Sequence, residues 1–90
     1  MREGRGLLNA SLSYFAEVVR CGSIRQAADR LHVAPSAISR QISLLEHELG
    51  ALLLTRSRRG VVPTEQGQLV SHFVGGVGRD LERLRGAVDD

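Results

Sequence analysis

The polar face of the predicted helix 35–49 is the first feature of this chain that could do chemistry. At about 100° per residue, one side of this helix collects Ser36, Ser39, Arg40, Ser43 and His47. The acids of the helix, Glu46 and Glu48, come late and lie away from the centre of this polar stripe. Short side chains near the positive helix N-terminus let the backbone approach a polyanion. The longer Arg40 could then reach a base edge in a DNA major groove.

A second group of basic side chains follows between Ala51 and Thr64. It contains Arg56, Arg58 and Arg59 and no acid. All twelve basic residues of the chain are arginine, the side chain suited to bidentate contacts with phosphates and guanines. The net charge is only +2, so the positive charge is local. Both groups could instead be solvated surface, and for Arg58 a solubilising turn is an adequate explanation.

Two amphipathic helices are predicted before the polar helix. Apolar residues at i, i+3, i+4 and i+7 define their buried faces, which are Leu12, Phe15, Ala16 and Val19 in the first and Ile24, Ala27, Ala28 and Leu31 in the second. Gly22 can end the first helix. Ser23 begins the second, with Gln26 placed for a capping box.

The third helix then begins at Pro35, a residue favoured at the first helical position. Its core face consists of Ile38, Ile42, Leu45 and Leu49, opposite the polar stripe. The break at 32–34 gives the spacing of a helix-turn-helix. After Gly50, the apolar runs 51–54 and 61–62 flank the arginine segment and predict a small hairpin, or wing, with the arginines at or near its tip.

A fourth helix is predicted from Thr64, which is a plausible N-cap followed by a favourable acid, Glu65. It carries a heptad seam made of Val70, Val74, Val77, Leu81, Leu84 and Val88. The seam either packs back on the domain or pairs with a second copy, and we favour the dimer because the seam runs nearly to the chain end. The glycines in range 75–78 each cost about 1 kcal/mol of helix propensity, so we expect a weak or bent middle.

The segment from Gly22 to Gly67, GSIRQAADRLHVAPSAISRQISLLEHELGALLLTRSRRGVVPTEQG, resembles the N-terminal winged helix-turn-helix of LysR-type transcriptional regulators. The resemblance rests on an ordered set of motifs: the Ser23 cap, Ala27-Ala28, the 38–46 helix, Leu49-Gly50, Arg56 with Arg59, and 64–67. It implies a mainly α fold, with three helices and a two-stranded wing followed by a long dimerising linker helix. It also implies a bacterial DNA-binding transcription factor.

The resemblance further implies that the third helix enters the major groove and that Arg59 reaches the neighbouring minor groove. Arg56 and Thr64 fall at backbone contacts. Arg25 either touches a phosphate or faces water. The full set of predicted DNA-contacting residues is Ser23, Arg25, Pro35, Ser36, Ser39, Arg40, Ser43, Arg56, Arg59 and Thr64. A two-fold dimer implies an interrupted inverted repeat as target.

The chain departs from the family pattern at the start of the third helix. Pro35-Ser36 replaces the usual Gln-Pro pair, and Ala34 stands where a capping Ser is common, so no base preference is transferred. Leu54 in place of Phe and Gln66 in place of Ala are packing variations.

The expected organisation is a flexible extension at 1–10, the DNA-binding domain at 11–63 and the linker helix at 64–90. We expect an isolated DNA-binding fragment without the family's effector-binding domain, so that a small-molecule effector would act only through that missing domain. RNA polymerase is a candidate partner of the full-length protein.

Other function classes find little support in the sequence. The three histidines, His32, His47 and His72, lack metal-ligand spacing, and no catalytic or phosphate-loop motif is present. We therefore expect no enzyme, metal or cofactor. Cys21 is alone and packs as a small hydrophobe, and the lack of a signal peptide or membrane span predicts a cytoplasmic protein. The alternative function is a winged-helix protein-interaction module without a DNA target.

Overall fold

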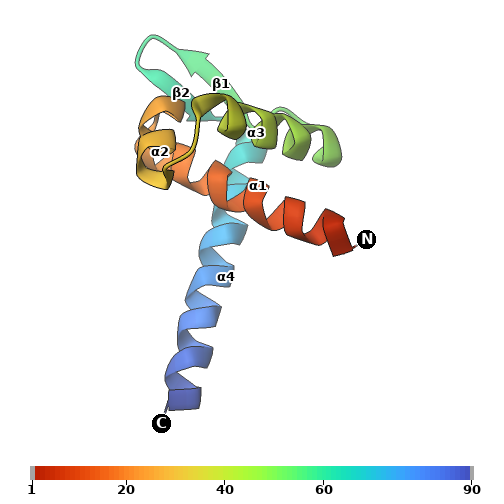
Figure 1. The fold of residues 1–90 in the computed structure, drawn as a ribbon, viewed down its shortest axis with the longest axis vertical. Coiled ribbons are helices and arrows are strands. Elements are labelled where there is room, and N and C mark those ends of the chain that lie inside the picture. Colours follow the sequence, from red (N-terminus) through yellow and green to blue (C-terminus); the bar gives the residue numbers. More distant parts are fainter. Residues whose placement is uncertain (1, 90) are drawn as a thin grey trace.

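The computed structural model describes residues 2–89, with side chains described from residue 10 onward. Four helices and one hairpin follow each other along the chain (Figure 1). Their bounds are α1 Arg2–Cys21, α2 Ile24–Leu31, α3 Pro35–Leu49, β1 Leu54–Ser57, β2 Gly60–Pro63 and α4 Glu65–Asp89. The mainly α fold, a winged helix-turn-helix followed by a long helix, is as predicted.

The start of α1 corrects one prediction. The helix begins at Arg2, about ten residues before the predicted start, so residues 2–10 are helical where a flexible extension was expected. Met1 lies outside the described residues. The apolar periodicity that predicted the helix does not extend into this segment, and its glycines, Gly4 and Gly6, are weak helix formers, so no local signal marks the extra length.

The predicted caps of the helix-turn-helix are confirmed. The Ser23 hydroxyl oxygen accepts a hydrogen bond from the Gln26 backbone N–H at 3.1 Å, and Pro35 is the first residue of α3. His32 ends α2 in the left-handed conformation, with φ at 58°. These local signals fix the three-residue turn between α2 and α3.

The core is small and largely aliphatic. Its largest fully buried side chains come from α1, α3 and the segment before β1, namely Phe15, Val18, Ile38, Leu45 and Leu53. Ala27 and Ala28 are also buried, which lets α2 lie close to its neighbours as predicted. Leu49, predicted as core, is 50% exposed, because it borders an apolar groove between α1, α3 and α4 instead of filling the core.

The wing is an antiparallel hairpin in which Thr55 pairs with Val62 and Arg56 with Val61. The first strand starts at Leu54, so the predicted apolar run 51–54 mostly precedes the strand. The reason is that Leu53 is buried in the core and connects α3 to the wing. Arg56 consequently lies within β1, and Arg58 and Arg59 form the two-residue turn at the tip.

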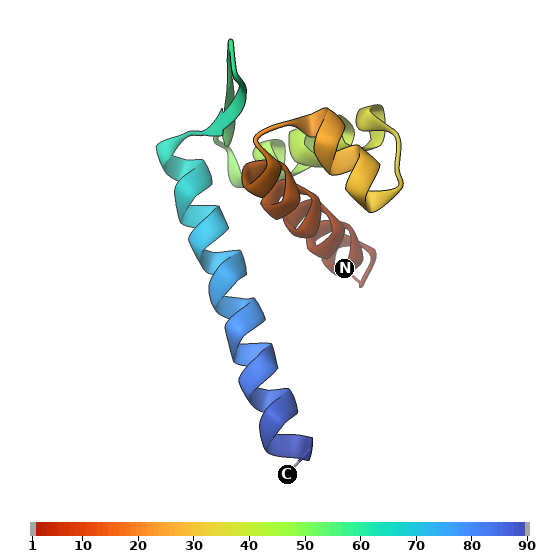
Figure 2. The same cartoon turned by 90° about the vertical axis from the view of Figure 1, so that its left-hand side faces the viewer.

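Helix α4 starts beside α1 and the wing and then projects away from the other elements (Figures 1 and 2). Thr64 caps it as predicted, since its Oγ1 accepts from the Gly67 N–H at 3.0 Å. A Cβ at Gly67 would overlap the Leu53 carbonyl oxygen, so glycine permits the close approach of α4 to the wing base. The helix is continuous through the glycines at 75–78.

Candidate nucleic-acid interface

The polar stripe of α3 is accessible along its length. Ser36, Arg40, Ser43 and His47 are exposed and Ser39 is half-buried, while Ile38, Ile42 and Leu45 on the opposite face are buried. The helix therefore presents small hydroxyls and one guanidinium outward, and its core face fixes its orientation.

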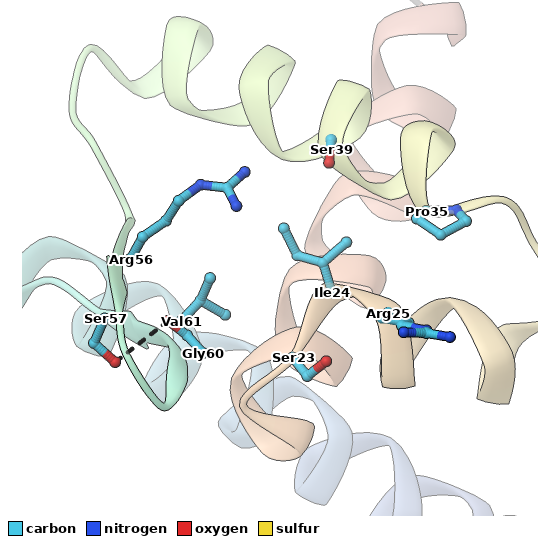
Figure 3. Close-up of a pocket in the computed structure, with 9 residues that line it drawn as sticks. All are labelled: Ser23, Ile24, Arg25, Pro35, Ser39, Arg56, Ser57, Gly60 and Val61. Carbon is cyan, nitrogen blue, oxygen red and sulfur yellow. Dashed lines mark hydrogen bonds between the residues drawn. The ribbon is translucent and has the colours of Figure 1, made fainter.

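A cleft separates the wing from the helix-turn-helix (Figure 3). Its volume is about 430 Å³, and its lining comes from α2, α3 and both strands: Ser23, Ile24, Arg25, Pro35, Ser39, Arg56, Ser57, Gly60 and Val61. Arg56 extends from β1 across this cleft toward α3 (Figure 3). Five of the predicted DNA-contacting residues thus line one concave surface.

The remaining predicted residues lie outside the cleft lining. Ser36, Arg40 and Ser43 follow the exposed face of α3, and Arg59 is exposed at the wing tip. Thr64 lies at the wing base, where its hydroxyl donates to the Leu52 carbonyl at 2.7 Å while accepting from Gly67. Its proton is already engaged, so this hydroxyl acts first as a structural clamp between the wing and α4.

The charge at this surface is positive and uncompensated. Among residues 10–89 the structure records one ion pair, between Arg20 and Glu17. The hydrogen bond from Arg20 holds the pKa of Glu17 below its ordinary value of 4.5. Five arginines of α2, α3 and the wing that were considered for DNA contact or for the wing tip are exposed and have no such carboxylate partner within the described residues: Arg25, Arg40, Arg56, Arg58 and Arg59. They are free to bind a polyanion.

Glu46 has a role that the sequence did not reveal. Its Oε2 accepts a hydrogen bond from the Leu53 backbone N–H at 2.8 Å, which ties the end of α3 to the segment entering the wing. The sequence could hardly have predicted this contact. A glutamate that binds the following chain reversal cannot be distinguished in sequence from a glutamate on a solvated helix face.

The predicted dimer seam divides into a covered part and an exposed part. Val70 packs against the core, whereas exposure rises from 42% at Val77 to 57% at Leu81 and 74% at Val88. Val74 is half-buried and Leu84 is exposed.

Two further apolar residues of α4, Leu69 and Phe73, were not part of the predicted seam and are 69% and 61% exposed. They border an apolar groove with a volume of about 310 Å³, lined also by Leu12, Leu45, Leu49 and Val70. Their i, i+4 spacing beside the seam was the signal in the sequence that could have predicted this wider apolar face.

Metal and membrane sites receive no support from this part of the chain. Residues 2–89 bring together no group of three or more His, Cys, Asp or Glu side chains able to hold a metal ion. Within the same residues, no helix has the length and apolar character needed to cross a membrane.

The sequence matches the family model for the bacterial regulatory helix-turn-helix proteins of the lysR family over residues 10–68. The chain therefore belongs to the LysR family and is a LysR-type helix-turn-helix DNA-binding domain. The family consists of transcriptional regulators rather than enzymes.

Curated relatives are similar over most of this chain. The nitrogen assimilation regulatory protein nac of Klebsiella aerogenes is 40% identical over 79 residues, which are 88% of this chain and 26% of nac. The transcriptional activator AmpR of Rhodobacter capsulatus is 38% identical over 86 residues, which are 91% of this chain and 29% of AmpR. The chain thus spans somewhat more than a quarter of the length of these relatives.

Solved structures of DNA complexes share the fold. The BenM DNA-binding domain bound to benA site 1 DNA has a TM-score of 0.79 at 34% identity, with 89% of this chain and 93% of that one covered. The complex of the CbnR DNA-binding domain with DNA has a TM-score of 0.68 at 37% identity, with 88% and 95% covered.

Proposed function

We propose that this domain binds double-stranded DNA sequence-specifically, with α3 in the major groove and the wing at the adjacent minor groove. The observation that carries the proposal is the cleft. Residues from α2, α3 and the wing that are far apart in sequence line one concave surface, beside exposed arginines that have no carboxylate partner among residues 10–89. The similar BenM and CbnR domains form complexes with DNA, which supports DNA as the partner of this surface.

Each group of side chains has a distinct proposed role. Arg40, with Ser36, Ser39 and Ser43 around it, reads base edges and nearby phosphates in the major groove. Pro35 keeps the start of α3 close to the duplex, and Ser23 and Arg25 bind a phosphate at the start of α2. Arg59 enters the minor groove from the wing tip, while Arg56 and Thr64 lie along the DNA backbone.

We further propose a homodimer through α4. The exposed seam from Val77 to Val88 and the groove beside Phe73 form contiguous apolar surface of the kind that marks interaction sites. Two domains related by a two-fold axis would read an interrupted inverted repeat. The proposed setting is the bacterial cytoplasm, with RNA polymerase and a small-molecule effector acting through parts of a full-length regulator beyond this domain.

The test is selection of binding sites from a random double-stranded DNA pool by the 90-residue chain, followed by sequencing. We expect an interrupted palindrome to be enriched. Enrichment of a single half-site would support DNA reading and contradict dimerisation by this chain. A folded protein that enriches no sequence would overturn the DNA-binding proposal.

A salt titration separates the alternative function, a protein-interaction module. When binding neutralises phosphates, the logarithm of the binding constant falls linearly with the logarithm of the salt concentration. The slope is about −0.9 for each phosphate contacted. We expect a slope that corresponds to several phosphates per domain, given the arginines at this surface. Binding of the selected DNA that is independent of salt would contradict the proposed role of the arginines.

A further inference from the structure

The wing is attached to the rest of the domain at two separate places. At its base, the Leu53 N–H donates to the Glu46 carboxylate at 2.8 Å, and the Thr64 N–H donates to the Leu53 carbonyl at 3.0 Å. These bonds join the wing to α3 and α4. They hold the base of the wing, and because a two-stranded hairpin alone is marginally stable, its position over the cleft depends on further contacts.

The second attachment lies on the flank that faces the cleft. The Val61 N–H donates to the Gly22 carbonyl at 3.2 Å, which joins β2 to the turn between α1 and α2. Gly60, the preceding residue, has φ at +130°, and a Cβ there would overlap the same Gly22 carbonyl oxygen. Any other L-residue at position 60 must move the strand away from the turn or give up the hydrogen bond.

This attachment connects two parts of the proposed DNA surface. Gly22 directly precedes Ser23, the cap of α2 that lines the cleft. Val61 is the register partner of Arg56, the arginine that extends across the cleft (Figure 3). This hydrogen bond, together with the packing of Leu54 and Val61 against the core, therefore sets how far Arg56 and the tip residue Arg59 lie from α3.

We propose that Gly60 is a positioning residue for DNA recognition, because its missing side chain lets the wing bond to Gly22 and holds the wing arginines in register with α3. The inference rests on the proposed function. The fixed wing allows both grooves to be engaged at once, since the cost of orienting the hairpin is met during folding rather than on binding.

The experiment compares Gly60→Ala with Gly50→Ala on the selected DNA. Gly50 also has a positive φ, +69°, but a Cβ there meets nothing within 4 Å. Both variants place a Cβ at a positive φ, with the greater strain at Gly60, whose φ of +130° lies outside the left-handed helical region of Gly50, and Gly60→Ala alone brings that Cβ against Gly22. We expect Gly60→Ala to weaken binding about tenfold, which is about 1.4 kcal/mol, and Gly50→Ala to leave binding unchanged.

A double-mutant cycle with Arg59→Ala separates positioning from general stability. If the displaced wing no longer places Arg59, the two losses will not add. Hydroxyl-radical footprinting of Gly60→Ala should lose protection at the minor-groove wing site and keep it along the α3 site. Additive losses, or wild-type affinity of Gly60→Ala, would overturn the proposal.

A second variant covers loss of folding. Val61→Pro removes the N–H that bonds to Gly22 while keeping Gly60, and proline is tolerated where a strand N–H points away from its ladder. We expect the same loss of the wing footprint. Failure of both variants to fold, judged by circular dichroism, would assign Gly60 to stability and overturn the positioning role. If the wild-type chain binds no DNA, the proposed function itself fails, whereas the results above test the positioning role in a chain that does bind.

Discussion

The helix-turn-helix and the far half of α4 use the same aliphatic residue types with opposite outcomes. In the former, Phe15, Leu45 and Leu53 are at most 1% exposed. In α4, Leu84 is 60% exposed and Val88 is 74% exposed. The first region completes its own core, and the second presents an apolar face that is completed only by another surface.

This difference separates recognition from assembly within 90 residues. The DNA-facing side chains are held by a closed core, so their geometry does not depend on a partner. The spacing between two such domains would depend on α4, where three glycines at 75, 76 and 78 lower helix propensity without interrupting the helix. Five substitutions test this difference between the closed core and the exposed helix.

Leu81→Asp should have the largest effect, because it places a charge at the centre of the exposed seam. In a two-fold dimer both copies lose a buried leucine, each worth about 1.5–3 kcal/mol. We expect sedimentation velocity to show a monomer where the wild type is a dimer, with each domain still folded. An unchanged mass would contradict dimerisation through this seam.

Phe15→Ala should destabilise the helix-turn-helix by about 3–5 kcal/mol, as large-to-small changes in a full core do. Leu84→Ala is the matched change in the exposed region and should leave the monomer's urea-unfolding midpoint nearly unchanged. Equal losses in dilute solution would show that α4 packs on its own domain.

Arg40→Ala should weaken binding to the selected DNA by about 1–3 kcal/mol and relax preference at one base position. Arg30, exposed on α2 outside the proposed contacts, supplies the control Arg30→Ala, which should retain the full preference. Equal weakening on every sequence would make Arg40 a phosphate contact.

Gly78→Ala should stabilise α4 by about 1 kcal/mol, since a Cβ there meets nothing within 4 Å. Helicity by circular dichroism should rise, and the dimer should persist to lower concentration. Alanine at Gly50, where φ is +69°, should instead lower the stability of the helix that ends there. A drop in helicity at position 78 would indicate that the glycine serves a close helix contact.

Glu17→Gln should give the smallest change. Arg20 lowers the folded-state pKa of Glu17 below 4.5, so the stabilisation is present above the ordinary carboxyl pKa and is lost as pH falls through the lowered value. The melting temperature of the variant should be slightly below that of the wild type at pH 7, and the two melting temperatures should coincide at low pH. Exposed pairs contribute little, and a large separation would contradict a surface role for this pair.

Much of the fold followed from the sequence because its signals are local. The 3.6-residue apolar period, the Ser23 and Thr64 caps and Pro35 at a helix start each act within a few neighbouring residues. The polar stripe of α3 is defined by the same period. These signals misled at the start of α1, where the backbone is helical without a clear apolar period. They also misled at Leu49, which has the correct period but borders a groove instead of the core.

The sequence alone therefore determined the helices, their caps, the hairpin and the choice of residues for the polar face. Tertiary structure decided how these parts meet: Glu46 with the Leu53 amide, Thr64 with the Leu52 carbonyl, and β2 with Gly22 across 39 residues of chain. These contacts join backbone groups and isolated side chains distant in sequence. Such pairs leave no periodic pattern, because their energy depends on a close approach that only the packed core creates.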